Sequence, residues 1–150
     1  MRSTVGNEKA LTLTEIMVAT VIMLLTIAGI LTSFLRCLEL QEMARNQSMA
    51  VKASKSKLEE MNNTVFNQIK ANFNNVTFTA NGLNGIGVSY VNDANPNLLL
   101  IRISFCWRQA NGRVVGEDKN LNGQVNAGED TNGNGLIDSP TTLVSNIFQR

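Results

Sequence analysis

Oxygen-bearing side chains recur at regular intervals in the segment 118–129. From Asp118 this segment matches the calcium-loop pattern D-x-[DN]-x-[DN]-G-x5-E at every specified position. Calcium takes six to eight oxygen ligands at ~2.3–2.6 Å, and the pattern supplies carboxylate, amide and carbonyl oxygens in the required order. The predicted ligands are the side chains of Asp118, Asn120, Asn122 and Asn126 (the last directly or through water), the backbone carbonyl of Gln124 and both carboxylate oxygens of Glu129.

A second, incomplete match to the same pattern follows directly. Its predicted ligands are Asp130, Asn132, Asn134 and Asp138, with Leu136 at the position of the backbone carbonyl. The twelfth position is Thr141, whose hydroxyl is a poor substitute for a bidentate glutamate. The two loops can therefore hold one ion each, or share Glu129 and Asp130 around a single ion. Because asparagine replaces aspartate at several positions, we expect a dissociation constant of about 10⁻⁴–10⁻³ M, the range of extracellular modules.

The surroundings of these loops differ from those of a helix-loop-helix calcium site. A predicted strand precedes Asp118, and Pro140 limits any helix that follows. We therefore expect calcium loops over 116–140 without flanking helices. The ion would have a structural role, because the segment is too polar to order itself by burial. The alternative is a metal-free loop built from Asn-Gly turns.

The composition argues against an enzyme and against a nucleic-acid partner. The chain has 150 residues, with 13 basic and 12 acidic side chains, no histidine and 5% aromatic residues. Without histidine there is no His-based triad and no His-ligated catalytic zinc, and G-x-S-x-G is absent. The near-neutral charge and scarce aromatic residues do not favour binding to phosphates or bases. Cys37 and Cys106 are predicted to be unpaired thiols, because they lie in separate elements.

An apolar run near the N-terminus determines where the rest of the chain resides. Residues 16–35 are 20 residues without a charge. As a helix they span about 30 Å, the thickness of the hydrocarbon core of a bilayer. Arg2 and Lys9 precede the run, so we expect a single-pass helix with a short cytoplasmic N-terminus and an exported C-terminal part. A buried helix of a soluble protein is the alternative.

The segment from Lys9 to Glu15, followed by the apolar run, resembles the signal of type IV prepilins. This resemblance implies a leader of residues 1–10, cleavage between Ala10 and Leu11 by a prepilin peptidase, and N-methylation of Leu11. Ala10 stands where the family nearly always has glycine, and Leu11 where it usually has phenylalanine or methionine. The resemblance also implies that Glu15 pairs with the free amine of a neighbouring subunit during assembly. The alternative is that Glu15 only marks a helix start, where the helix dipole favours an acid.

Two further segments, 50–61 and 98–107, are similar to parts of PilV-like minor pilins and minor pseudopilins. The resemblance implies a non-enzymatic subunit of a type IV pilus or a type II secretion filament. The implied partners are other pilin or pseudopilin subunits, the prepilin peptidase and the bacterial inner membrane, and the filament would be periplasmic or extracellular. An alternative from another class is a singly anchored extracytoplasmic calcium-binding adhesion module that does not assemble. A membrane-anchored hydrolase is a third, but the chain lacks the usual catalytic residues.

The remaining patterns predict an α+β fold of pilin-like type. Residues 11–35 are expected to form a transmembrane assembly helix, and residues 36–70, without proline or glycine, to continue it as an amphipathic helix. Residues 71–150 are expected to form a small antiparallel sheet that lies on this helix and carries the calcium loops. The predicted strands are 76–79, 86–91, 98–108 and 113–115, with an Asn111–Gly112 hairpin and a last strand at 143–148.

Overall fold

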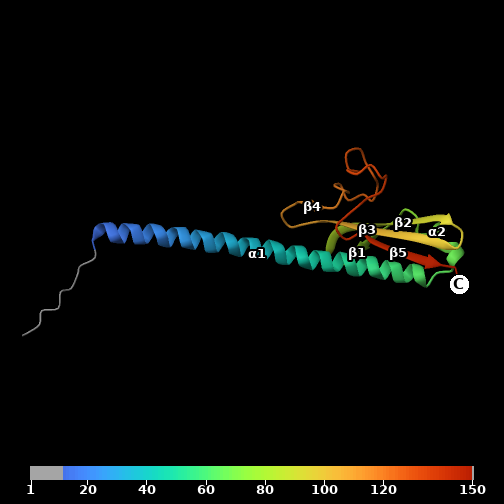
Figure 1. Ribbon diagram of the computed structural model, residues 1–150, viewed down its shortest axis with the longest axis horizontal. Helices are drawn as coiled ribbons and strands as arrows, with labels where there is room; N and C mark the ends of the chain where they lie inside the picture. Colours follow the sequence, from blue (N-terminus) through green and yellow to red (C-terminus); the bar gives the residue numbers. More distant parts are fainter. Residues whose placement is uncertain (1–11, 150) are drawn as a thin grey trace, which may run out of the picture. The chain divides into compact units, whose positions relative to one another are not determined.

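The computed structural model describes residues 12–149, so Ala10 and Leu11 lie outside the described residues. The architecture is α+β, as the sequence predicts, with a long N-terminal helix, a short second helix and a small antiparallel sheet (Figure 1). Helix α1 covers Leu13–Asn62 and helix α2 covers Phe66–Phe73. The chain divides into two compact units that meet between residues 41 and 42.

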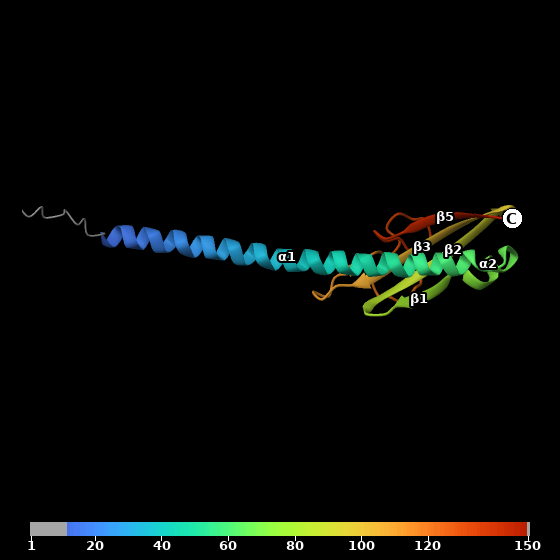
Figure 2. The same ribbon diagram turned by 90° about the horizontal axis from the view of Figure 1, so that it is seen from below.

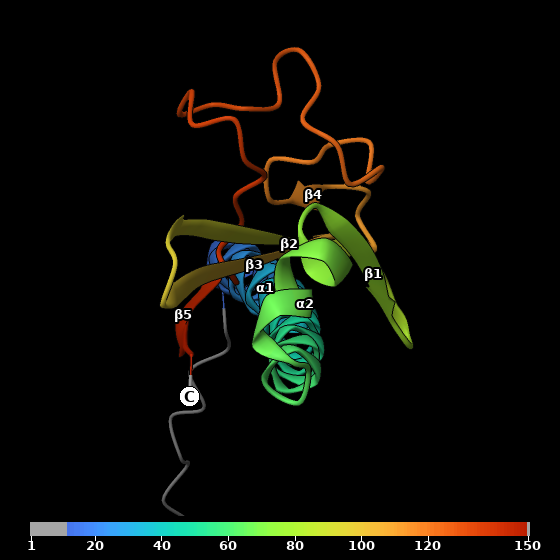
Figure 3. The same cartoon turned by 90° about the vertical axis from the view of Figure 1, so that its right-hand side faces the viewer.

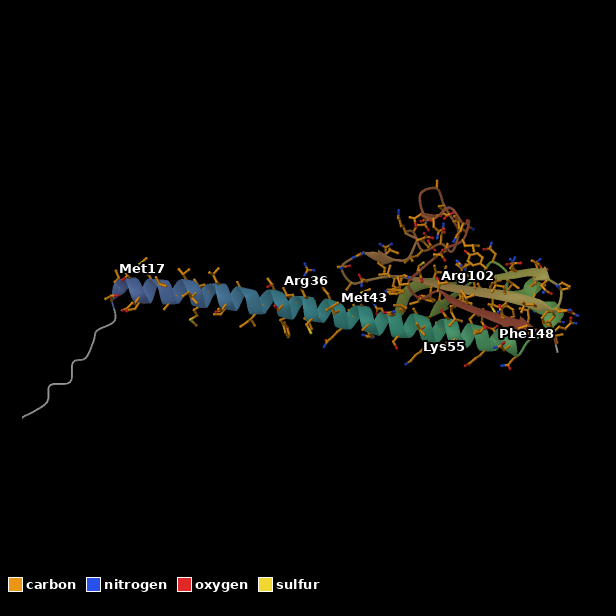
Figure 4. The ribbon with its side chains drawn as sticks, in the orientation of Figure 1. Met17, Arg36, Met43, Lys55, Arg102 and Phe148 are labelled. Carbon is orange, nitrogen blue, oxygen red and sulfur yellow. The ribbon has the colours of Figure 1, made fainter. Side chains whose placement is uncertain are left out.

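The first unit is the N-terminal part of α1, in which every side chain from residue 12 to residue 41 is exposed. Met17, for example, projects outward (Figure 4). Among residues 12–149, α1 is the one helix that is long and apolar enough to cross a membrane. Its hydroxyls donate to backbone carbonyls three or four residues earlier, which satisfies them without water. These hydroxyls belong to Thr20, Thr26, Thr32 and Ser33.

The helix ends earlier than the sequence predicts. The expected helix continues unbroken to residue 70, whereas α1 ends at Asn62. The chain there reads Asn-Asn-Thr, three weak helix formers, and the Thr64 hydroxyl donates to the carbonyl of Glu60 at 2.9 Å. Val65 then adopts an extended conformation (φ −60°, ψ 132°). The break lets α2 turn back, so that its apolar side can join the core beside α1.

Five strands form one antiparallel sheet. They are β1 (Val76–Ala80), β2 (Leu83–Asn95), β3 (Leu98–Arg108), β4 (Val114–Val115) and β5 (Leu143–Phe148). Strand β2 lies between β1 and β3, and the other edge of β3 pairs with β5 along its first half and with β4 at its end. The strands follow the predicted ones closely, except that β2 is longer at both ends.

The turn from β3 to β4 is longer than the predicted two-residue hairpin. The N–H of Gln109 donates to the carbonyl of Arg113 at 2.8 Å, which leaves three residues to close the turn. The last of these, Gly112, has φ 84°. A three-residue hairpin commonly ends in such a left-handed residue, so the Asn-Gly signal is used here in a longer turn.

One face of the sheet packs on the second part of α1 (Figure 2). Alternate residues of β3 point to this face and are fully buried, namely Ile101, Ile103, Phe105 and Trp107. Met61 of α1 packs with Ile69 and Phe73 of α2 at one end of the core. Ala50 of α1 packs against the other end. The small side chain of Ala50 lets the helix approach the sheet closely.

The opposite face of the sheet is covered by the segment 116–140. There Cys106 of β3 and Val88 of β2 pack against Ile137, and none of the three is more than 2% exposed. Figure 3 shows this orange-to-red segment on the side of the sheet that faces away from α1. Residues 104–107 of β3 are therefore buried on both faces, and the loop segment is part of the core rather than an appendage.

Candidate metal-binding loops

The predicted calcium ligands lie in two consecutive loops, named loop A (118–129) and loop B (130–141). In loop A the carboxylate of Asp118 organises the turn. Its Oδ1 accepts the N–H of Asn122 at 3.1 Å, and its Oδ2 accepts the N–H of Gly123 at 2.7 Å. Gly123 has φ 75°, a left-handed conformation that glycine adopts without strain. The Asp118 side chain is fully buried.

Glu129 closes loop A from its other end. Its Oε1 accepts the N–H groups of Lys119 at 3.0 Å and Asn120 at 3.3 Å, and its Oε2 accepts the N–H of Asn126 at 3.1 Å. Glu129 is 6% exposed. The first and last predicted ligands of loop A are therefore both buried carboxylates held by backbone N–H groups.

Three asparagines complete the network of loop A. The Nδ2 groups of Asn120 and Asn122 both donate to Oδ1 of Asn126 at 2.8 Å. Their own Oδ1 atoms accept backbone N–H groups two residues further on, from Asn122 and Gln124. Five of the predicted side-chain ligands are thus joined in one hydrogen-bonded network, and Gln124 joins it through its backbone.

Loop B begins with the same geometry. Asp130 Oδ1 accepts the N–H groups of Gly133 at 2.7 Å and Asn134 at 3.2 Å, and Oδ2 accepts that of Gly135 at 2.8 Å. These backbone donors, Gly135 foremost, lower the pKa of Asp130 because they favour the carboxylate. The N–H of Leu136 donates to Oδ1 of Asn134 at 2.7 Å. Leu136, whose carbonyl is a predicted ligand, therefore directly follows this turn.

Asp138 occupies in loop B the place that Asn126 has in loop A. Its Oδ2 accepts from Nδ2 of Asn132 at 2.8 Å and of Asn134 at 2.7 Å. Its Oδ1 accepts from Arg102 of β3 at 2.7 Å, and Figure 4 labels this arginine beside the loop segment. Loop B is therefore tied to the sheet by an ion pair.

The adjacent acids Glu129 and Asp130 accept hydrogen bonds from different loops. The carboxylate of Glu129 accepts hydrogen bonds from loop A. The carboxylate of Asp130 accepts them from loop B. The adjacent acids therefore point into different loops.

The donor set fits a hard cation. Among residues 12–149, no three side chains of the types His, Cys, Asp and Glu gather closely enough to hold a metal ion by themselves. A cation in either loop would therefore also need asparagine and backbone carbonyl oxygens, which calcium accepts readily. Neither loop contains histidine or cysteine, so zinc or copper would lack their preferred ligands.

Both loops are fixed against the sheet. At Gly123 of loop A, a Cβ atom would collide with the side-chain methyl of Thr77 in β1, so the backbone lies directly on the strand. In loop B the N–H of Ile137 donates to the hydroxyl of Tyr90 in β2 at 3.1 Å. Burial of Tyr90 under this segment raises the pKa of its hydroxyl.

Glu15, in the first unit, makes contacts within its own helix start. The N–H and the hydroxyl of Thr12 donate to Glu15 Oε2 at 2.8 and 2.9 Å, and the N–H of Glu15 donates to the Thr12 hydroxyl oxygen at 3.3 Å. This is the arrangement of a capping box, which satisfies free donors at the helix N-terminus. The helix-start role is thus visible in the geometry, whereas the assembly role stays a prediction.

Comparison with known proteins gives no family assignment. A scan against protein-family models, a search of curated proteins and a search of solved structures each found no match. The function therefore has to be inferred from the residues and the geometry of this chain.

Proposed function

We propose that this chain is a non-enzymatic subunit of a type IV pilin-like filament, a minor pilin or pseudopilin, with a head stabilised by calcium. The order of features along the chain carries the proposal. A short basic segment and Glu15 precede 20 charge-free residues, and the same helix then packs on an antiparallel sheet. The resemblance of the segment 9–15 to a prepilin signal makes this order more specific than a membrane anchor alone.

The exposed apolar part of α1 provides the physical basis for assembly. Its side chains need an apolar environment, which either a bilayer or a bundle of sibling helices can supply. Transfer of this helix from the bilayer to a helix bundle therefore changes the burial of its apolar side chains little. Polar groups then decide the register between neighbouring helices. Glu15 is the one acid beside the apolar run, and a carboxylate in such a place needs a partner. Cleavage before Leu11 would create a free N-terminal amine on the neighbouring subunit, and this amine can be the partner of the Glu15 carboxylate.

The first test is the mass of the protein isolated from its native membranes. We expect a chain that begins at Leu11 and carries one methyl group, and the Glu15→Gln variant should insert into the membrane yet be strongly depleted from sheared filaments. A Thr12→Ala variant is the control, because it removes the capping hydroxyl and leaves the carboxylate. Recovery of residues 1–10 on the mature protein, or normal incorporation of Glu15→Gln, would contradict the proposal.

The capping box favours the second candidate, a singly anchored extracytoplasmic calcium-binding adhesion module. Glu15 already has a local role there and needs no neighbouring subunit. The same experiment separates the two candidates. A module that does not assemble keeps its N-terminal residues and is absent from filaments, whether or not Glu15 is changed.

The calcium part of the proposal is tested by thermal unfolding of the full chain in detergent. Calcium at ten- to hundredfold above its dissociation constant should stabilise the head by about 1.4–2.7 kcal/mol for each ion bound. Addition of a chelator should remove this stabilisation. The double variant Asp118→Asn with Glu129→Gln should show a smaller calcium-dependent rise in melting temperature than the wild type, whereas Glu59→Gln, on the exposed side of α1, should respond like the wild type. A wild-type melting temperature that does not change on addition of chelator would contradict the proposed role of calcium.

A further inference from the structure

The two loops belong to a 12-residue repeat that begins before loop A. Gly116-Glu117-Asp118 recurs as Gly128-Glu129-Asp130. The backbone repeats with it, because left-handed residues occur at equivalent places. Their φ angles are 110° and 81° at Gly116 and Gly128, 59° and 72° at Leu121 and Gly133, and 75° and 74° at Gly123 and Gly135. Glu117 is therefore the counterpart of Glu129.

Glu117 makes in loop B the contacts that Glu129 makes in loop A. Its Oε1 accepts the N–H of Thr131 at 3.2 Å and also the Thr131 hydroxyl, and its Oε2 accepts the N–H of Asp138 at 3.0 Å. Thr131 and Asp138 are the second and ninth residues of loop B. Glu129 accepts the N–H groups of the second and ninth residues of loop A. Each glutamate thus closes the loop of the other repeat.

Thr141, the twelfth residue of loop B, does not close that loop. Its side chain is 5% exposed, and its hydroxyl donates to the carbonyl of Phe105 in β3 at 3.0 Å. The threonine therefore belongs to the sheet contact. The place that a bidentate glutamate occupies in a calcium loop is filled in loop B by Glu117.

Burial of negative charge points to a cation independently of the loop shape. Asp118 is fully buried and Glu129 is 6% exposed, yet neither takes part in an ion pair within residues 12–149. Lys119, the nearest basic residue in sequence, donates instead to the carbonyl of Gly128 at 3.0 Å. A buried carboxylate without a counter-charge is strongly unfavourable, so the site calls for a positive ligand. Glu117 and Asp130, whose carboxylates accept hydrogen bonds from loop B, also form no ion pair within residues 12–149.

We infer that residues 116–140 form a two-ion calcium site with crossed closure, in which Glu129 completes loop A and Glu117 completes loop B. The choice of calcium rests on the proposed function, while the second ion and the role of Glu117 go beyond it. Loop B then has its full set of oxygens: Asp130, Asn132, Asn134, the Leu136 carbonyl, Asp138 and Glu117.

Equilibrium dialysis of the full chain in detergent against ⁴⁵Ca²⁺ at saturating concentration tests this assignment. The wild type should bind two ions per chain. Glu117→Gln and Glu129→Gln should each bind one ion, and the Glu59→Gln control should still bind two. Asp130→Asn should lose the same ion as Glu117→Gln, so the double variant Glu117→Gln with Asp130→Asn should bind one ion rather than none.

The far-UV circular dichroism of every variant shows whether the fold is retained. One ion on the wild type, or two ions on Glu117→Gln, overturns the crossed closure but leaves the filament proposal and the loop A site intact. Loss of both ions from a folded Glu117→Gln variant also overturns the crossed closure, because Glu117 would then be needed for ion binding in both loops rather than in loop B alone. No bound ion on the wild type overturns both this inference and the calcium part of the proposed function.

Discussion

At the scale of single residues, the loops depend on backbone N–H groups that converge on carboxylates. Asp118, Glu129, Asp130 and Glu117 each accept at least two hydrogen bonds from the segment 116–140, and most of the donors are main-chain N–H groups. Such bonds need the chain to take left-handed turns, which glycine allows without a steric penalty. The glycines are therefore as important to the site as its acids.

Two glycines at equivalent places form a matched pair for mutation. Gly135→Ala meets no atom within 4 Å and should cost only the left-handed strain, about 1–2 kcal/mol of unfolding free energy. Gly123→Ala has the same strain and also collides with Thr77, so it should cost about 2–4 kcal/mol. Urea unfolding in excess calcium measures both, and an equal effect of the two changes would contradict the packing of loop A on β1.

The sequence predicts which side chains of loop A come together, because the calcium-loop pattern fixes their spacing along one continuous segment. It does not predict the position of Glu117, since this residue precedes the pattern and closes a loop that is not its neighbour. A signal for it exists in the recurrence of Gly-Glu-Asp after 12 residues. Sequence position alone cannot show that the two repeats exchange their glutamates, because that exchange is a property of the folded chain.

At the scale of elements, α1 and β3 are the members around which the head is built. The alternation of apolar residues predicts the strands well, because a half-buried strand needs that period. The end of α1 at Asn62 is harder to predict, since no proline or glycine marks it and the apolar spacing continues into α2. Tertiary packing decides the outcome there, because the break lets α2 place Ile69 and Phe73 against Met61.

The contact between α1 and the sheet contains a buried hydroxyl without a partner. Ser54 is fully buried, and its Oγ makes no hydrogen bond. Ser54→Ala should therefore raise the unfolding free energy by about 1 kcal/mol. Ser89→Ala is the matched control, because the equally buried Ser89 hydroxyl donates to the carbonyl of Phe73 at 2.7 Å and its loss should destabilise. Denaturant unfolding of both variants checks the sign, and destabilisation by Ser54→Ala would refute the prediction.

At the scale of the whole molecule, the head has three layers, with helices, sheet and loop segment in that order. Alternation along β3 predicts only one buried face. The second buried face arises because the polar loop segment folds onto it and contributes Ile137. A cation bound in the loops would thereby be linked to the packing of the sheet, and Cys106 lies at the contact between the loop segment and the sheet.

The two cysteines should report this link by their alkylation rates. Burial raises the pKa of Cys106 to about 11, so at pH 8 only about one thiol in a thousand is the reactive thiolate. Cys37 is exposed and should react quickly. Chelation of calcium should speed the labelling of Cys106 at least tenfold and leave Cys37 unchanged, as mass spectrometry of iodoacetamide-treated protein would show. Equal rates for Cys106 with and without chelator would mean that the segment covers the sheet regardless of the cation.

The exchange of glutamates between the two repeats also limits how the gene segment can vary. One 12-residue repeat cannot form a complete loop by itself, because the glutamate of each repeat accepts hydrogen bonds from the loop of the other repeat. Deletion or gain of a single repeat would leave one turn unclosed and one glutamate idle, so length variation should proceed by pairs of repeats. Among natural variants, replacement at position 117 should accompany changes at 130 or 138 rather than at its immediate neighbour, 118.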